Sequence, residues 1–254
     1  MKLDILYEDN DIIVCHKAPG VSSQTERSYD PDMVSLLMNH FHKTGVKTPY
    51  VGVVHRLDKP VAGVIVYGKN ERATKALSEQ ITHHQFTKRY YAIVCGDAVS
   101  HLSDSTAHGT YCFTDYLLRD AKTNTSAVVD QASPAYKHNK EVKKSSLSFR
   151  VIKTISLSSD SPFYRENCPY DNKLSLVDID LHTGRHHQIR VQFSHHGLPL
   201  WGDQRYSLYS KEMGQRQGVA LCAHTLTITH PTTKKEMTFQ VIPSNSIFKK
   251  CFDL

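Results

Sequence analysis

The sequence lacks several features that would assign it to a familiar class of protein. None of its apolar runs approaches the roughly 20 residues that a membrane-spanning helix needs. It contains no glycine-rich phosphate loop, no G-x-S-x-G elbow and no H-E-x-x-H segment, which argues against nucleotide-dependent enzymes, α/β-hydrolases and zinc proteases. Its first residues are polar and acidic, unlike a secretion signal. We therefore expect a cytoplasmic protein with no membrane segment and no nucleotide cofactor.

Paired cysteines are also missing, because the six cysteines are scattered and form no C-x-x-C motif. Most of them sit in apolar segments, so we expect buried free thiols rather than disulfides or metal ligands. They are Cys15, Cys95, Cys112, Cys168, Cys222 and Cys251.

Length, composition and net charge further limit the domain organisation and the kind of partner. A chain of 254 residues can form one large domain or two closely packed subdomains. The hydrophobic content of 39% is typical of a globular protein. The formal net charge of +6 slightly favours a polyanionic partner, although many proteins with such a charge never bind nucleic acid.

Residue patterns along the chain predict more strands than helices. Because the two types do not alternate regularly, we predict an α+β fold with a largely antiparallel sheet rather than a doubly wound one. The strand over residues 86–96 is apolar on both faces, as in the centre of a sheet. The expected strands span residues 4–7, 12–15, 51–58, 64–68, 86–96, 174–181, 221–229 and 236–241, with weaker signals at 126–130 and 147–155, and the expected helices span 32–43, 70–84 and 184–196.

The polar run from His55 to Pro60 interrupts an apolar pattern and contains Asp58. An aspartate after a strand often only forms a turn, and Pro60 supports that interpretation. The alternative is a carboxylate held rigidly on the floor of a cleft, with Arg56 close by. Taken alone, the run leaves both interpretations open.

A second polar run extends from His182 to Arg190. In the helix expected from residue 184, Arg190 borders the apolar stripe, so it either extends to water or turns inward to pair with a carboxylate. His182, His186 and His187 suggest a metal site, but no cysteine or carboxylate joins them at zinc-like spacing. We expect exposed or RNA-facing imidazoles and no metal.

Together these runs resemble the RluA-type family of RNA pseudouridine synthases. Residues 55–58 match its H-R-L-D motif, residues 88–96 its K-x-Y-x-A-x-V-x-G strand, and residues 183–190 its T-G-R-x-H-Q-I-R motif. Shorter matches lie at residues 5–20, 199–203 and 230–231. The chain departs from the family at Cys222 and Gln192, where histidine is frequent, and we expect these departures to affect substrate choice rather than the reaction.

The resemblance implies a role for each site residue. Asp58 takes the position of the family's nucleophile, Tyr90 that of its active-site tyrosine, and Arg190 that of the arginine paired with the aspartate. Arg56 takes the position of the arginine that fills the base stack after the uridine has left it. RNA contacts are also expected from His55, Lys88 and Arg185.

The resemblance also implies a fold and an activity. The expected fold is the α+β pseudouridine synthase fold, with a long mixed, largely antiparallel sheet split into two subdomains with flanking helices. We predict a single catalytic domain over residues 1–254, without a separate N-terminal RNA-binding module, acting as a monomer.

The predicted reaction isomerises a specific uridine in ribosomal or transfer RNA and uses no cofactor. Two alternatives belong to other classes. A noncatalytic RNA-binding protein would have no reason to combine Asp58, Tyr90 and Arg190. A hydrolase of the glycosylase type usually needs a second carboxylate, which no second motif supplies.

Overall fold

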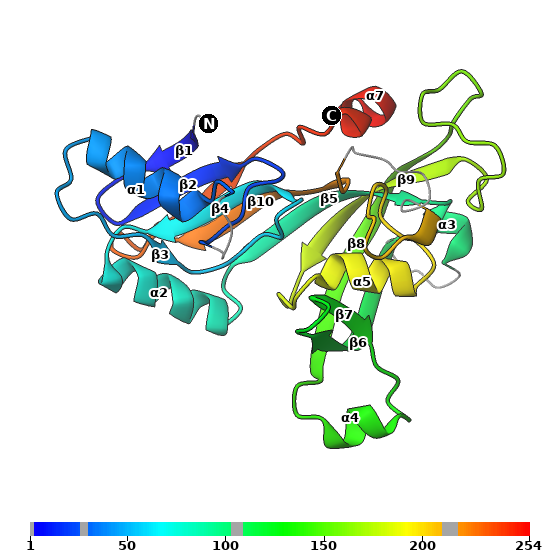
Figure 1. The fold of residues 1–254 in the computed structure, drawn as a ribbon, viewed down its shortest axis with the longest axis horizontal. Coiled ribbons are helices and arrows are strands. Elements are labelled where there is room, and N and C mark those ends of the chain that lie inside the picture. Colours follow the sequence, from blue (N-terminus) through cyan, green and yellow to red (C-terminus); the bar gives the residue numbers. More distant parts are fainter. Residues whose placement is uncertain (1–2, 26–29, 103–108, 210–217) are drawn as a thin grey trace. The chain divides into compact units, whose positions relative to one another are not determined.

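The structure, a computed structural model, describes residues 3–25, 30–102, 109–209 and 218–254 (Figure 1). Strands outnumber helices, and the sheet is mixed but mostly antiparallel, so the predicted α+β class is confirmed. The chain divides into two compact units, as expected. Unit 1 comprises Met1–Arg89 and Cys222–Pro243, and unit 2 comprises Tyr90–Leu221 and Ser244–Leu254.

Unit 1 is built around the hairpin predicted at the start of the chain. Strands β1, β2, β4 and β10 lie side by side in that order, while β3 pairs with β4 and β11 pairs with β10. The pair of β4 and β10 is parallel, and β2 pairs with β4 in the antiparallel sense. The elements are β1 (Asp4–Glu8), β2 (Ile12–Lys17), α1 (Met33–Lys43), β3 (Gly52–Val53), β4 (Ala62–Gly68), α2 (Glu71–Thr82), β10 (Leu221–Thr229) and β11 (Glu236–Gln240).

Helix α2 begins where the sequence predicts and packs closely on the strands of unit 1. The Asn70 side chain caps it by accepting a hydrogen bond of 2.8 Å from the backbone N–H of Ala73. A Cβ atom at Gly68 would lie only 2.1 Å from the Oγ1 atom of Thr74, so β4 and α2 approach each other too closely for any larger residue. The buried cluster to which both elements contribute contains Ile12, Val14, Val64, Val66, Ala73, Leu77, Phe86, Leu226 and Ile228.

Unit 2 contains the longest strands of the protein. Its strands follow the order β5, β9, β8, β6, β7, and the pairs from β9 to β7 are antiparallel. The elements are β5 (Thr87–Cys95), whose first residues belong to unit 1, α3 (Ala98–His101), β6 (Thr110–Asp120), β7 (Thr125–Val128), α4 (Pro134–His138), β8 (Lys143–Ser156), β9 (Lys173–Leu181), α5 (Gln188–His195) and α7 (Ser246–Phe252).

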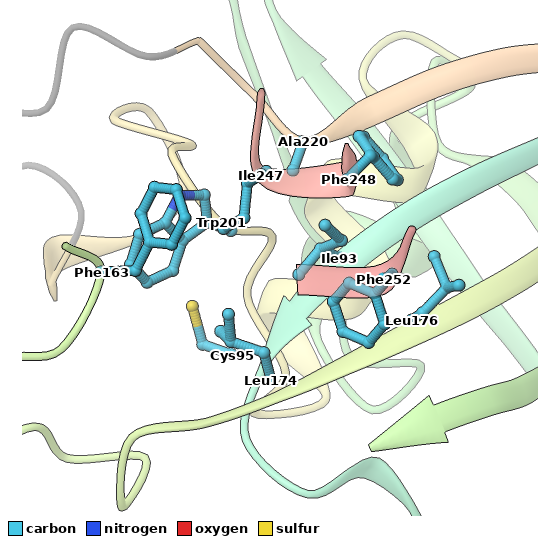
Figure 2. Packing of buried hydrophobic residues seen from close by; sticks show 10 residues of the cluster. All are labelled: Ile93, Cys95, Phe163, Leu174, Leu176, Trp201, Ala220, Ile247, Phe248 and Phe252. Carbon is cyan, nitrogen blue, oxygen red and sulfur yellow. The ribbon is translucent and has the colours of Figure 1, made fainter. Parts of the chain in front are cut away.

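The core of unit 2 confirms that β5 is a central strand. Besides its neighbour β9, β5 exchanges main-chain hydrogen bonds with two other segments, from Ile93 N–H to Ala220 O (3.0 Å) and from Trp201 N–H to Ile93 O (2.9 Å). Side chains from β5, β9 and α7 gather around these segments (Figure 2). The cluster contains Ile93, Cys95, Phe163, Leu174, Leu176, Trp201, Ala220, Ile247, Phe248 and Phe252.

Four elements of unit 2 were not predicted, namely β6, α7 and the short helices α3 and α4. Strand β6 alternates as a half-buried strand should, with Tyr111, Phe113 and Leu117 buried, but the charged Asp115 occupies an inward position and breaks the apolar pattern. Helix α7 is short, and Lys249 and Lys250 interrupt the apolar pattern from which a helix could be predicted. In the described part of the chain no helix is both long and apolar enough to span a membrane.

Three predictions of detail were wrong. The strand expected over residues 51–58 is limited to β3, because the chain after Val53 forms an irregular loop. The helix expected from residue 184 begins at Gln188, because His187 has a left-handed backbone with φ of 54°. All six cysteines are free thiols, but Cys112 is exposed and only Cys15, Cys95 and Cys222 are fully buried.

Candidate active site

The loop that carries Asp58 is fixed by main-chain hydrogen bonds. Ser23 holds the preceding residue from both sides: its Oγ accepts from Leu57 N–H at 3.0 Å and donates to Leu57 O at 2.8 Å. The Asp58 carbonyl accepts from Val61 N–H at 2.9 Å, which closes a turn. Asp58 is half-buried at this turn. The turn that the sequence suggested is therefore present, and the main chain on both sides of Asp58 is held in place.

A buried lysine lies beside this loop. Lys17, at the end of β2, is fully buried, and its Nζ donates to the carbonyls of Val21 (2.7 Å), Lys59 (3.2 Å) and Ala18 (3.3 Å). Burial lowers the pKa of Lys17 to about 8, while the charge of Asp58 opposes this shift. The ammonium group thus joins β2 to the loop and brings a positive charge close to Asp58.

The other predicted site residues of unit 1 have different environments. His55 is part of the loop's structure: its Nε2 accepts from Val66 N–H at 3.1 Å, and its ring packs edge-on against Phe86. Burial, with a contribution from the charge of Lys88, lowers the pKa of His55 to about 3, so the imidazole is neutral.

Lys88 is half-buried, and burial lowers its pKa. Arg56 is exposed. Their RNA contacts stay predictions.

Arg190 lies in the first turn of α5 and is paired with a carboxylate that the sequence analysis did not consider. Its Nε donates to Asp203 Oδ2 at 2.7 Å and its Nη2 donates to Asp203 Oδ1 at 2.8 Å. Both side chains are almost fully buried, with 5% and 1% exposed. Arg190 therefore turns inward, as one of the two sequence interpretations required, and its pairing with Asp58 stays a prediction.

Tyr206 connects Arg190 to the start of α5. The guanidinium carbon of Arg190 lies 5.2 Å from the centre of the Tyr206 ring. The Tyr206 hydroxyl accepts from Ser126 N–H at 2.8 Å and is hydrogen-bonded to His187 Nδ1 at 2.7 Å. The His187 ring in turn stacks on His186, with 3.7 Å between ring centres. This chain of contacts fixes the aromatic ring that faces the arginine.

Two further predicted residues lie in unit 2. Tyr90 on β5 is 7% exposed, so its ring is largely buried. Arg185 is exposed and its Nε donates to Lys144 O at 3.1 Å, which attaches the loop before α5 to the start of β8. The RNA contact predicted for Arg185 remains to be tested.

The predicted site residues thus fall into two groups. His55, Arg56, Asp58 and Lys88 belong to unit 1, whereas Tyr90, Arg185 and Arg190 belong to unit 2. Within unit 1 the structure brings Lys88 close enough to His55 for its charge to help lower the pKa of the imidazole. Within unit 2 the ion pair with Asp203 fixes the orientation of the Arg190 guanidinium.

Four residues that hold the predicted site residues in place had no predicted role, namely Lys17, Ser23, Asp203 and Tyr206. Lys17 and Asp203 had a detectable signal, because each lies within two residues of an apolar stretch that folding would bury. Ser23 and Tyr206 act through hydrogen bonds to distant segments, which no local pattern reveals. Among the residues with described positions, no three histidine, cysteine or acidic side chains gather as a metal ion would require.

Comparison with known proteins identifies the family. Residues 11–195 match the family model described as RNA pseudouridylate synthase. The chain is 30% identical over 245 residues to the uncharacterized RNA pseudouridine synthase YlyB of Bacillus subtilis, covering 94% of this chain and 69% of that protein. It is 25% identical over 247 residues to tRNA pseudouridine synthase C of Haemophilus ducreyi, covering 95% and 91%.

Two further relatives complete the comparison. Ribosomal large subunit pseudouridine synthase D of Yersinia pestis is 29% identical over 204 residues, covering 80% of this chain and 52% of that protein. The solved structure of human RNA pseudouridylate synthase domain containing 4 covers 97% of this chain and 92% of its own, with a TM-score of 0.68 and 18% identity, and supports the fold. The chain belongs to the RluA-type family of RNA pseudouridine synthases and is an enzyme of that kind.

Proposed function

We propose that the enzyme converts a specific uridine of ribosomal or transfer RNA to pseudouridine, with Asp58 as the nucleophile. The observation that carries this proposal is the structure of the Asp58 loop. Hydrogen bonds to the main chain hold this loop on both sides of the aspartate, and the buried ammonium of Lys17 lies next to it. A carboxylate fixed in this way is oriented before the substrate arrives, which lowers the cost of reaching the reactive geometry.

The reaction needs no external reagent. The bond between N1 of uracil and C1′ of ribose breaks, the uracil turns, and a bond forms between its C5 and C1′. The hydrogen on C5 leaves as a proton, and N1 gains one. Asp58 attacks the nucleoside and is released unchanged, so an aspartate is sufficient as the covalent catalyst. Arg190 orients and pairs with Asp58, and Tyr90 either stacks on the uracil or assists the removal of the C5 proton.

The uridine must leave the base stack before Asp58 can reach it, at a cost of a few kcal/mol. Arg56, which is exposed two residues before Asp58, fills the gap in the stack with its planar guanidinium. His55, Lys88 and Arg185 add RNA contacts. The similarity to a tRNA enzyme and to a ribosomal enzyme supports both substrate classes. A cytoplasmic location also remains a prediction.

The test uses transcripts of transfer RNA and ribosomal RNA that carry tritium at C5 of uridine. The wild-type protein should release tritium from one class without added cofactor, and sequencing should locate the pseudouridine. Asp58→Ala should reduce the release by at least about four orders of magnitude while the protein stays folded. Asp160→Ala, an exposed aspartate in another loop, is the matched control and should act like wild type. An active Asp58→Ala variant, or release of free uracil, would contradict the proposal.

A further inference from the structure

The ion pair between Arg190 and Asp203 defines the orientation of the arginine within unit 2. A guanidinium has five N–H groups in one plane, and the pair with Asp203 uses two of them, Nε–H and one Nη2–H, on the same edge. Two parallel hydrogen bonds of 2.7 and 2.8 Å allow the plane little freedom to tilt. The direction of the opposite edge, which carries Nη1, is thereby fixed.

The Asp203 carboxylate is itself held by its own loop. Its Oδ1 accepts from the backbone N–H of Arg205 at 3.0 Å and of Tyr206 at 3.3 Å. The backbone carbonyl of Asp203 accepts from Ser207 N–H at 2.9 Å. An aspartate that bonds the main chain two and three residues later forms a compact turn. The carboxylate therefore has a fixed position even before Arg190 binds to it.

Tyr206, at the end of the same turn, restricts movement of the Arg190 guanidinium out of its own plane. Its ring lies near the guanidinium, and its hydroxyl is anchored to Ser126 and His187. The Ser194 hydroxyl also donates to the Tyr206 carbonyl at 2.5 Å, which attaches the turn to α5. One short turn thus supplies the carboxylate at the edge of the guanidinium and the ring near it.

We propose that Asp203 is a positioning residue for the reaction, because it sets the plane and the direction of the Arg190 guanidinium. The inference rests on the proposed catalytic part of Arg190 and adds the residue through which the fold controls it. A lysine could carry the positive charge but could not accept this orientation, since an ammonium has no plane to fix. Asp203 contacts neither the nucleophile nor the RNA in this proposal, and acts only through Arg190.

The test compares chemistry with RNA binding in Asp203→Asn, which has the same shape but offers one oxygen instead of two. Single-turnover tritium release from the transcript that wild type modifies should slow by about 100-fold, as for a small misplacement of a catalytic group. The dissociation constant of that transcript should change by less than about threefold, since exposed lysines and arginines dominate RNA affinity. A rate within about threefold of wild type would overturn the proposal.

A double-variant comparison separates positioning from a merely structural role. If Asp203 acts through Arg190, adding Asp203→Asn to Arg190→Lys should slow the reaction by no more than about threefold beyond Arg190→Lys alone. Independent losses that multiply would overturn the proposal. If circular dichroism shows that Asp203→Asn does not fold, Asp203→Glu takes its place, since it retains the charge on a longer side chain. The results expected of Asp203→Asn, and those that would overturn the proposal, then apply to Asp203→Glu.

Asp115→Asn is the matched control. Asp115 is also a buried aspartate and contacts the other end of α5, where it accepts from Gln192 Nε2 at 2.6 Å and lies 3.2 Å from His196 Nε2. Its substitution should leave the single-turnover rate within about threefold of wild type. A loss as large as that of Asp203→Asn would mean that any disturbance of α5 slows the reaction, and would overturn the proposal.

The two proposals fail in different ways. If wild type releases no tritium, or Asp58→Ala still does, the proposed function fails. If both of these behave as expected and Asp203→Asn keeps the wild-type rate, only the inference about Asp203 fails.

Discussion

Units 1 and 2 hold their site residues by different means. In unit 1 the anchors of the Asp58 loop bind main-chain atoms: Ser23 bonds the N–H and carbonyl of Leu57, and Lys17 donates to carbonyl groups. In unit 2 the anchor of Arg190 is another side chain, Asp203, in a buried ion pair. One unit thus fixes the path of its backbone, and the other fixes the orientation of a long side chain.

This difference follows from the distance between each functional group and its backbone. An aspartate has only two side-chain torsions, so fixing its loop largely fixes its carboxylate. An arginine places its guanidinium four torsions from the backbone, and even a rigid helix leaves that group undirected. The buried carboxylate of Asp203 fixes the direction of the guanidinium. Removing either partner, however, leaves a buried charge unpaired.

The largest test of this comparison removes the side-chain anchor of unit 2. Arg190→Ala leaves the Asp203 carboxylate buried without its partner, so we expect the free energy of unfolding to fall by about 3–5 kcal/mol. Urea denaturation followed by circular dichroism measures this change. Arg205→Ala removes an exposed arginine that lies close to the same aspartate and donates to the carbonyls of Thr123 and Asn124, and it should lower stability by no more than about 1.5 kcal/mol. A loss below about 1 kcal/mol for Arg190→Ala would show that the pair is not a main support of unit 2.

A second test uses the neutral histidine of the Asp58 loop. Because the pKa of His55 is about 3 when folded and near its ordinary value when unfolded, the unfolded chain binds an extra proton between these values. Stability should therefore fall as the pH is lowered through this window, by up to about 2 kcal/mol at pH 5. His55→Gln keeps an acceptor for Val66 N–H but does not titrate. Urea denaturation at neutral pH and at pH 5 should show a smaller loss for His55→Gln; equal losses would contradict the environment assigned to His55.

The smallest expected effect is the loss of one main-chain anchor in unit 1. Ser23→Ala removes both hydrogen bonds to Leu57, and we expect a loss of about 1–2 kcal/mol, because other bonds still hold the loop. Thermal unfolding measures the change, with Ser78→Ala on the outer part of α2 as the control. If Ser23→Ala were as damaging as Arg190→Ala, the contrast between the two kinds of anchoring would disappear.

Elements with strong local patterns could be predicted from the sequence. Residues 12–15 of β2 and most of β4 are continuous apolar runs, and α2 has both an N-cap and a helical stripe. Strand β6 was missed because Asp115, a charged residue at an inward position, is stabilised by Gln192, 77 residues later in the chain. No local window contains the partner that makes such a burial possible.

Sequence motifs pointed to candidate site residues but not to the residues that hold them in place. Motifs pointed to Asp58, Arg190 and Tyr90, and the turn around Asp58 follows from Pro60. The predicted helix start was wrong because Gln188 folds the loop before it: its side chain accepts from Arg185 N–H and from the Thr183 hydroxyl. Asp58 was the only carboxylate predicted to pair with Arg190, whereas the pairing with Asp203 depends on how the turn at 203–206 packs against α5.

The division of the chain into discontinuous units also affects how the protein is made. Unit 1 needs β10 and β11 from the last part of the chain, and unit 2 needs Ile247, Phe248 and Phe252 of α7 to complete its core. During synthesis on the ribosome, unit 1 can therefore complete its native packing only after β11, which ends at Gln240, has emerged, and unit 2 only after α7, which ends at Phe252. Until then, the nascent chain has strands with unpaired edges, and such edges favour aggregation.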